Sequence, residues 1–304
     1  MRVPHRLILS ALVLTLSVGI MTSASAQVLP LLDLKLNIII AVSDDGSVAP
    51  PIASATQQQW DYIIGKVSDI WSQAGISVSL LDQPTIFNST EAMTGLVSSG
   101  TRPNGDLAKL TGPITWDGVP DYSSTYTGIS GLLVTEALNV VFVQNVPAFN
   151  VSQMYSNGAA GLAHLSSTRT WYSGGVPYLT ETKLGGNGIA MWAGDYLLDG
   201  YRESRLDTIA KVLAHEIGHN LGLGHPDDAD KYADDHLLSG YNSSNLMLSA
   251  GTSSTTTLTP WQIDRARTTG LDPRNGFLTP VPEPATLVLL TIGGLMLGRR
   301  RRAA

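Results

Sequence analysis

The sequence predicts an α+β fold: a twisted, mostly parallel sheet, a helix that carries two histidines, and a smaller C-terminal part. Two observations predict this fold. Residues 34–82 follow the order strand, helix, strand, which forms a right-handed crossover between parallel strands. A second helical pattern at 207–221 completes the larger part, 27–221, and residues 222–278 are assigned to the smaller part.

The first predicted elements follow one another closely. The stretch "LKLNIIIAV" (34–42) is apolar and β-branched, as in a buried strand. Residues 56–74 place apolar side chains three and four apart, as on one face of a helix, and Gly75 closes that helix. The stretch "ISVSLLD" (76–82) is expected to be a second strand.

The middle of the chain is less regular. Residues 83–135 are rich in Gly, Ser, Thr, Pro and Asn, which indicates loops and short strands. The stretch "LNVVFVQNV" (138–146) predicts a central strand. Two more strands are expected at 159–167 and 186–194, joined by a polar loop.

Two helices are predicted in the C-terminal half. Asp207 is a suitable N-cap for the first helix, which Gly222 ends. The second helix begins at a Thr-Pro pair within residues 258–267.

Composition sets limits on the class of protein. With 304 residues, 43% hydrophobic and 14% charged, the chain can bury the core of one large domain or two modest ones. Its net charge of -6 argues against nucleic acid as a partner. The absence of cysteine excludes thiolate metal ligands.

Both termini carry targeting signals. Residues 1–26 combine leading arginines, an apolar run and a small-residue cleavage site before Gln27, as in a secretory signal peptide. Residues 281–302 combine Pro-Glu-Pro, about 14 apolar residues and four arginines, which could form an ordinary membrane anchor. This order resembles the PEP-CTERM sorting tail, which implies a membrane processing enzyme as a partner and a cell-surface or extracellular location. We therefore divide the chain into a signal peptide, a domain at 27–278 and a tail at 279–304.

Three of the six histidines lie within "HEIGHNLGLGH". On a helix, His215 and His219 are one turn apart and share a face, so both can bind one cation. Glu216 is placed to act as a general base on a water at that cation. Gly222 lets the chain turn so that His225 returns as a third ligand.

Three imidazoles with one open position favour a single catalytic zinc, which would activate a water for amide hydrolysis. A lone His-Glu-x-x-His also occurs by accident, but here five positions agree. No glutamate lies between Ile217 and Pro282, so a later glutamate ligand is excluded. Asp227 or Asp228 stays open as an alternative third ligand.

The motif resembles the long zinc signature of the metzincin metallopeptidases, and this resemblance implies a zincin-like fold. In that family a methionine turn lies beneath the zinc, and Met247 in "SSNLMLSAG" matches it, the alternative being a core methionine. Pro226 resembles the serralysin branch. Ser249, however, stands where serralysins and astacins have a zinc-binding tyrosine.

The resemblance also implies a substrate-binding edge strand at Gly161, Leu162, Ala163 and His164. His164 could bind a structural zinc as in matrixins, but an ordinary polar role is favoured because companion histidines are missing. The acidic loop at 226–236 could hold Ca²⁺, although a solvated loop is favoured.

The resemblance implies a secreted zinc endopeptidase acting on a protein or peptide substrate. Few residues separate Gln27 from the first strand, too few for an inhibitory propeptide, so activity is expected directly after export. The alternative is a non-catalytic surface or extracellular-matrix protein with a structural metal site. Glu216 favours the enzyme, because a structural site has no need of an adjacent base.

Overall fold

The structure is a computed structural model, and it divides the chain into two compact units, Met1–Pro30 and Leu31–Ala304. The predicted signal peptide and all but four residues (279–282) of the predicted sorting tail lie outside the described residues. The described residues are 29–94, 115–116, 119–120, 128–144, 161–163, 167–173, 176–184, 188–192, 203–226, 243–248, 256–272 and 277–282.

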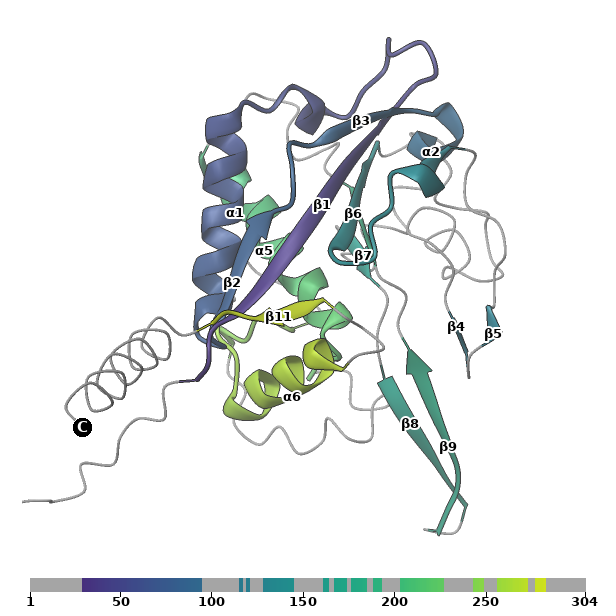
Figure 1. The fold of residues 1–304 in the computed structure, drawn as a ribbon, viewed down its shortest axis with the longest axis vertical. Helices are drawn as coiled ribbons and strands as arrows, with labels where there is room; N and C mark the ends of the chain where they lie inside the picture. Colours follow the sequence, from purple (N-terminus) through teal and green to yellow (C-terminus); the bar gives the residue numbers. More distant parts are fainter. Residues whose placement is uncertain are drawn as a thin grey trace, which may run out of the picture. The chain divides into compact units, whose positions relative to one another are not determined.

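A mixed, mostly parallel sheet of seven strands organises the second unit (Figure 1). Its strands are β1 (Leu32–Val42), β2 (Ile76–Leu80), β3 (Thr85–Asn88), β6 (Leu138–Val143), β7 (Gly161–Ala163), β10 (Ile189–Trp192) and β11 (Leu278–Pro280). The strand β1 pairs in parallel with β2, β3 and β6, and β6 pairs in parallel with β10. Only β11 on β1 and β7 on β10 are antiparallel. The predicted parallel sheet is thereby confirmed.

A second sheet contains β4 (Thr115–Trp116), β5 (Val119–Pro120), β8 (Ser167–Ser173) and β9 (Val176–Leu184). The long antiparallel pair β8–β9 corrects the polar loop predicted between 167 and 186. Both segments are rich in β-branched or aromatic residues and in threonine, which suits a strand. Polar composition obscured this preference in the sequence.

The helical elements are η1 (Pro51–Ser54), α1 (Gln57–Ser72), α2 (Thr90–Thr94), η2 (Ile129–Gly131), α5 (Glu203–Asn220) and α6 (Pro260–Leu271). The side chains of Thr56 and Thr259 cap α1 and α6 in capping boxes. The predicted helices at 56–74 and 258–267 are thereby confirmed. None of the helices in the described part is long and apolar enough to cross a membrane.

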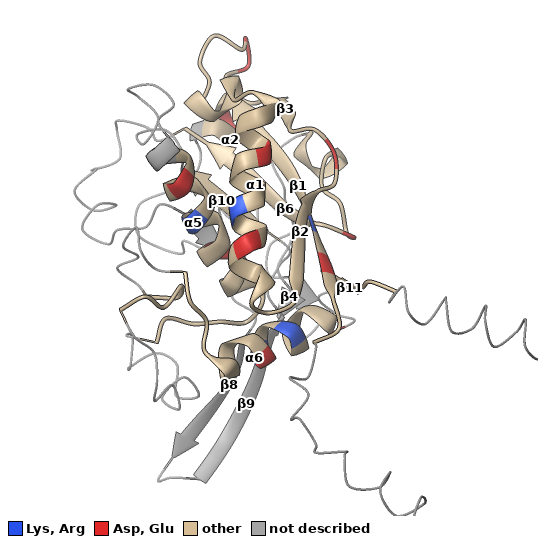
Figure 2. Ribbon diagram, turned by 90° about the vertical axis from the view of Figure 1, so that its left-hand side faces the viewer, with Lys and Arg blue, Asp and Glu red and all other residues tan. Residues whose placement is uncertain are grey.

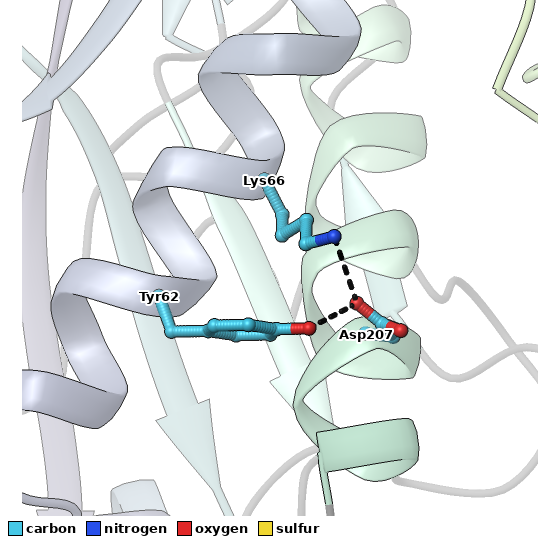
Figure 3. Close-up of polar contacts among 3 residues, drawn as sticks. All are labelled: Tyr62, Lys66 and Asp207. Atoms are coloured by element: carbon cyan, nitrogen blue, oxygen red, sulfur yellow. Dashed lines mark hydrogen bonds and ion pairs between the residues drawn. The ribbon is translucent and has the colours of Figure 1, made fainter.

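The predicted N-cap at Asp207 is wrong, because α5 begins at Glu203. Leu206 is buried in step with Ile209 and extends the apolar face of the helix by one turn. The carboxylate of Asp207 instead accepts a hydrogen bond from the Tyr62 hydroxyl (2.9 Å) and lies 3.9 Å from the Lys66 ammonium (Figure 3). Asp207 therefore ties α5 to α1.

The two faces of the sheet carry separate apolar clusters, because successive strand residues point to opposite faces. Ile38 and Ile40 of β1 belong to the cluster that also contains the buried residues of α1 and α5. Ile39 and Ala41 belong to the other cluster, with residues of α2 and η2. Both acidic and basic residues lie on α1, α5 and α6 (Figure 2). The sheet and α1 thus hold α5 in a fixed place.

Candidate metal centre

Helix α5 is anchored before it reaches the histidines. One face of the helix is buried against α1 and the sheet, through Leu206, Ile209, Leu213 and Ile217. The indole N–H of Trp71 on α1 donates to the Ala214 carbonyl at 3.2 Å, in the turn that starts the motif. Burial of several large apolar side chains, at about 1.5–3 kcal/mol each, fixes this helix firmly.

The helix ends in a Schellman motif. Gly222 has φ 83°, a left-handed conformation that glycine adopts without the Cβ penalty. Its N–H donates to the His219 carbonyl, and the N–H of Leu223 donates to the Gly218 carbonyl, both at 2.9 Å. The predicted stop at Gly222 is confirmed, and it directs residues 223–225 back toward the helix.

Three histidine side chains meet at this helix end. The Nε2 atom of His225 lies 3.1 Å from Nε2 of His215 and 3.1 Å from Nε2 of His219. The possible ligand atoms of the three rings all lie within 4.8 Å of one another. Within the described residues, this is the one group of three or more His, Cys, Asp or Glu side chains that could hold a metal ion.

The partners of two rings fix where their protons are. Nδ1 of His215 lies 2.8 Å from the Leu246 carbonyl, and Nδ1 of His219 lies 2.7 Å from the Leu223 carbonyl. A carbonyl only accepts, so both Nδ1 atoms carry the hydrogen. In the neutral rings the Nε2 lone pairs therefore point toward Nε2 of His225.

This arrangement fits a cation. Nε2 of His225 can carry at most one hydrogen, which can satisfy only one of the two lone pairs that face it at 3.1 Å, whereas a cation would satisfy all three nitrogens. Zinc at about 2.0–2.1 Å from each nitrogen separates tetrahedral ligands by about 3.3 Å. Burial lowers the pKa of His219 well below its usual value, and the neighbouring His215 and His225 lower it further. His219 is thus neutral at neutral pH, as a ligand must be.

Glu216 is also buried, with 6% of its surface exposed. Burial raises the pKa of its carboxyl from 4.5 to about 8. A divalent cation at the three histidines would oppose this shift, because it favours the charged carboxylate. A buried carboxyl with a pKa near neutrality can exchange a proton in this pH range, so Glu216 is a candidate general base.

Met247 packs directly against the histidine-bearing helix. It is fully buried, and a Cβ atom built on Gly218 would overlap its sulfur. Residues Asn245 to Leu248 form a turn in which the Leu248 N–H lies 3.4 Å from the Asn245 carbonyl. This turn brings the methionine beneath α5 and the Leu246 carbonyl to His215.

The other predicted site residues are placed only in part. Gly161, Leu162 and Ala163 form β7, the last strand of the main sheet order, antiparallel to β10. His164, Ser249 and the acidic loop beyond Pro226 lie outside the described residues. The substrate strand and the Ca²⁺ alternative stay predictions.

The sequence analysis did not identify Asn220, a buried residue that holds the end of α5. Asn220 is 1% exposed, and its side-chain amide binds both the N–H and the carbonyl of Gly188, each at 3.2 Å. This pairing joins the end of α5 to the start of β10. The position of Asn220 next to His219 in the motif was the available signal.

Comparisons with known proteins give a limited picture. Residues 280–302 match the family model of the PEP-CTERM protein-sorting motif. That match indicates an exported protein held in the membrane by its C-terminal tail. No curated protein matches the chain in sequence.

One similar solved structure is the crystal structure of metalloproteinase-II from Bacteroides fragilis, with 14% sequence identity and a TM-score of 0.35. The match covers 79% of this chain and 57% of that chain.

Proposed function

We propose that this protein is an exported zinc endopeptidase of metzincin type, with His215, His219 and His225 as the zinc ligands and Glu216 as the general base. The observation that carries the proposal is that the Nε2 atoms of the three histidine rings lie close together. Backbone carbonyls fix the tautomers of two of these rings, His215 and His219. An exported protein is also supported by the sorting motif at 280–302. We further propose that residues 1–26 direct export and are removed before Gln27.

The chain's own residues account for most of the mechanism. Zinc, when bound, would lower the pKa of a coordinated water toward neutrality. The buried carboxylate of Glu216 would take the proton released as that water attacks the scissile carbonyl, and would then deliver it to the leaving amine. The Leu246 carbonyl would hold the ligand His215 in one orientation, and Met247 would support the helix at Gly218.

The substrate would be an extended protein or peptide segment. The strand β7 ends the main sheet order, so its outer side would be available for a further strand. We propose that the substrate backbone pairs there, at Gly161 to His164, because an added strand recognises a main chain without requiring a particular sequence. A non-catalytic surface protein with a structural metal site is the alternative.

The decisive experiment compares two glutamate substitutions in residues 27–282. Glu216→Gln keeps the size of the side chain but removes its basicity, so zinc should be retained while cleavage of unfolded proteins falls by at least about 100-fold. Glu136→Gln makes the same chemical change at an exposed position and should leave cleavage unchanged. His219→Ala should lose most of the zinc.

Two outcomes would contradict the proposal. Full zinc retention by His219→Ala would overturn the ligand assignment. Cleavage by the wild type and by Glu216→Gln at equal rates would overturn the role of the glutamate. Zinc binding without cleavage by the wild type would instead support the structural alternative.

A further inference from the structure

A buried pair of side-chain amides lies next to the turn that packs against the histidine-bearing helix. Asn245 and Gln262 are 1% and 0% exposed, and their side-chain amides bind each other. Asn245 Nδ2 donates to Gln262 Oε1 at 2.8 Å, and Gln262 Nε2 donates to Asn245 Oδ1 at 3.1 Å. A buried amide pair of this kind is costly unless its partners hold it in place.

The backbone fixes the orientation of both amides. Asn245 Oδ1 also accepts from the Met247 N–H at 3.0 Å, and Gln262 Oε1 also accepts from the Thr259 N–H at 2.9 Å. Because a backbone N–H only donates, neither amide can be turned over without losing a bond. Asn245 is therefore locked to the N-terminus of α6 on one side and to the turn containing Met247 on the other.

That turn is the element that contacts the metal centre. Between Asn245 and Met247 lies Leu246, whose carbonyl accepts from His215 Nδ1 at 2.8 Å. Met247 itself packs on Gly218, between the two histidines of α5. The position of both contacts depends on the conformation of residues 245–247. The Asn245 side chain holds this conformation by accepting a hydrogen bond from the Met247 N–H.

We infer that Asn245 and Gln262 are positioning residues of the metal centre, acting through the Leu246 carbonyl and Met247 to fix the ring of His215. This inference rests on the proposed function, because it concerns the affinity and geometry of the zinc site. The pair binds no metal itself. It holds the His215 ring at the angle and in the tautomer that a ligand requires, and groups that orient a ligand in this way typically change metal affinity about 10- to 100-fold when removed.

The chain provides a matched control in a second buried amide pair. Asn37 Nδ2 donates to Asn139 Oδ1 at 2.8 Å, and Asn139 also binds the backbone of Val134. Asn139 is 2% exposed, like Asn245, but it joins β6 to the loop before that strand. Substituting it removes the same kind of bonds without touching the turn at 245–248.

The test measures zinc affinity by competition with a chelator, and the absorption spectrum of the cobalt(II)-substituted protein, which reports ligand geometry. Asn245→Ala removes the bonds to Gln262 and the bond to the Met247 N–H. It should weaken zinc binding by about 10- to 100-fold and alter the cobalt spectrum. Gln262→Met keeps the volume, removes the bonds to Asn245 and to the Thr259 N–H, and leaves the bond between Asn245 and Met247. It should have a smaller effect in the same direction. Asn139→Ala should lower the thermal midpoint but leave zinc affinity and the cobalt spectrum as in the wild type.

The outcomes separate this inference from the proposed function. A wild type that binds no zinc overturns both. A wild type that binds zinc, with Asn245→Ala or Gln262→Met giving an unchanged affinity and an unchanged cobalt spectrum, overturns the positioning role alone. If Asn245→Ala does not fold, Gln262→Met carries the test. An equal loss of affinity in Asn139→Ala would show that general destabilisation, and not positioning, causes the effect.

Discussion

The sulfur of Met247 occupies the space that a side chain on Gly218 would need. Gly218 lies between the two histidines of α5, and Met247 is fully buried. A methyl group at residue 218 must therefore displace the end of the Met247 side chain, in the turn whose Leu246 carbonyl contacts His215. The glycine within the motif thus allows the turn to approach the helix closely.

We predict that Gly218→Ala destabilises the protein, with Gly65→Ala in α1 as the control. Both changes improve helix propensity by about 1 kcal/mol. A Cβ on Gly65 meets no atom within 4 Å, so Gly65→Ala should stabilise. Overpacking at Gly218 should cost about 1–3 kcal/mol and outweigh the gain, measured by denaturant unfolding. Equal stabilisation by both variants would refute the close packing.

The same contact predicts coupling between residues 218 and 247. Met247→Ala alone should cost about 2–5 kcal/mol, because it leaves a cavity beneath α5. In that background Gly218→Ala partly fills the cavity, so the double variant should be at least about 1 kcal/mol more stable than the sum of the single changes predicts. Additive effects in a double-mutant cycle would contradict the contact.

Gly222 and Gly75 allow a second matched comparison. Both have positive φ, 83° and 64°, and both follow a helix, but only Gly222 leads to a histidine of the cluster. Alanine at either position should cost about 1–2 kcal/mol of stability. Gly222→Ala should also weaken zinc binding by at least about tenfold, because His225 moves, whereas Gly75→Ala should leave zinc affinity unchanged. Chelator competition measures the difference.

The buried carboxyl of Glu216 predicts a pH effect in the zinc-free protein. Its pKa is raised to about 8 in the folded state, so the folded state holds one more proton than the unfolded state between about pH 4.5 and 8. The contribution of this carboxyl to the free energy of unfolding therefore falls as pH rises through this range. Glu216→Gln lacks the effect and should be more stable than the wild type at pH 8–9, by up to about 5 kcal/mol, but equally stable below pH 4.5.

Zinc provides the internal control for that measurement. A bound cation offsets the cost of the carboxylate charge, so adding zinc should narrow the gap between the two proteins at pH 8–9. Urea unfolding across the pH range, with and without chelator, measures both curves. A gap that does not change with pH would show that Glu216 is not the titrating group.

The C-terminal boundary of the folded domain is also testable. The sheet extends to Pro280, two residues past the predicted end at 278, and Phe277 and Leu278 are 2% and 5% exposed. A chain ending at Pro282 should therefore keep its stability, zinc binding and cleavage while losing surface retention. A chain ending at Asp272 should lose about 3–5 kcal/mol of stability, because it lacks the two buried apolar side chains of Phe277 and Leu278 and uncovers the surface they pack on. Thermal unfolding of the two chains decides the point.

Local patterns account for what the sequence predicted. The spacing of His215, His219 and His225, and the position of Gly222, follow from the geometry of one helix and its end. The strand at 34–42 and the helix at 56–74 were recognisable because continuous burial and one-sided burial leave different periodicities. Elements of this kind carry their signal in a short stretch of chain.

What was missed depends on contacts between distant segments. Nothing near Asp207 in the sequence shows that Tyr62 lies opposite it, and local signals therefore predict an N-cap at a residue that lies inside α5. Asn245 and Gln262 are 17 positions apart in the sequence, and Met247 and Gly218 are 29 positions apart, yet each pair is in contact in the fold. Such polar and packing pairs become visible only when the backbone brings both members together.

The last strand has a mechanical consequence for a protein held by its tail. The strand β11 pairs with the first residues of β1, and the Val281 N–H donates to the Leu31 carbonyl at 3.0 Å. Leu278 is packed tightly against Gly270 near the end of α6, the helix that carries Gln262. Force applied to the tail thus enters the domain through three strand residues and passes to the helix that braces the histidine site. Tension on the tail would therefore act on α6 and, through Gln262 and Asn245, on the turn next to the three histidines.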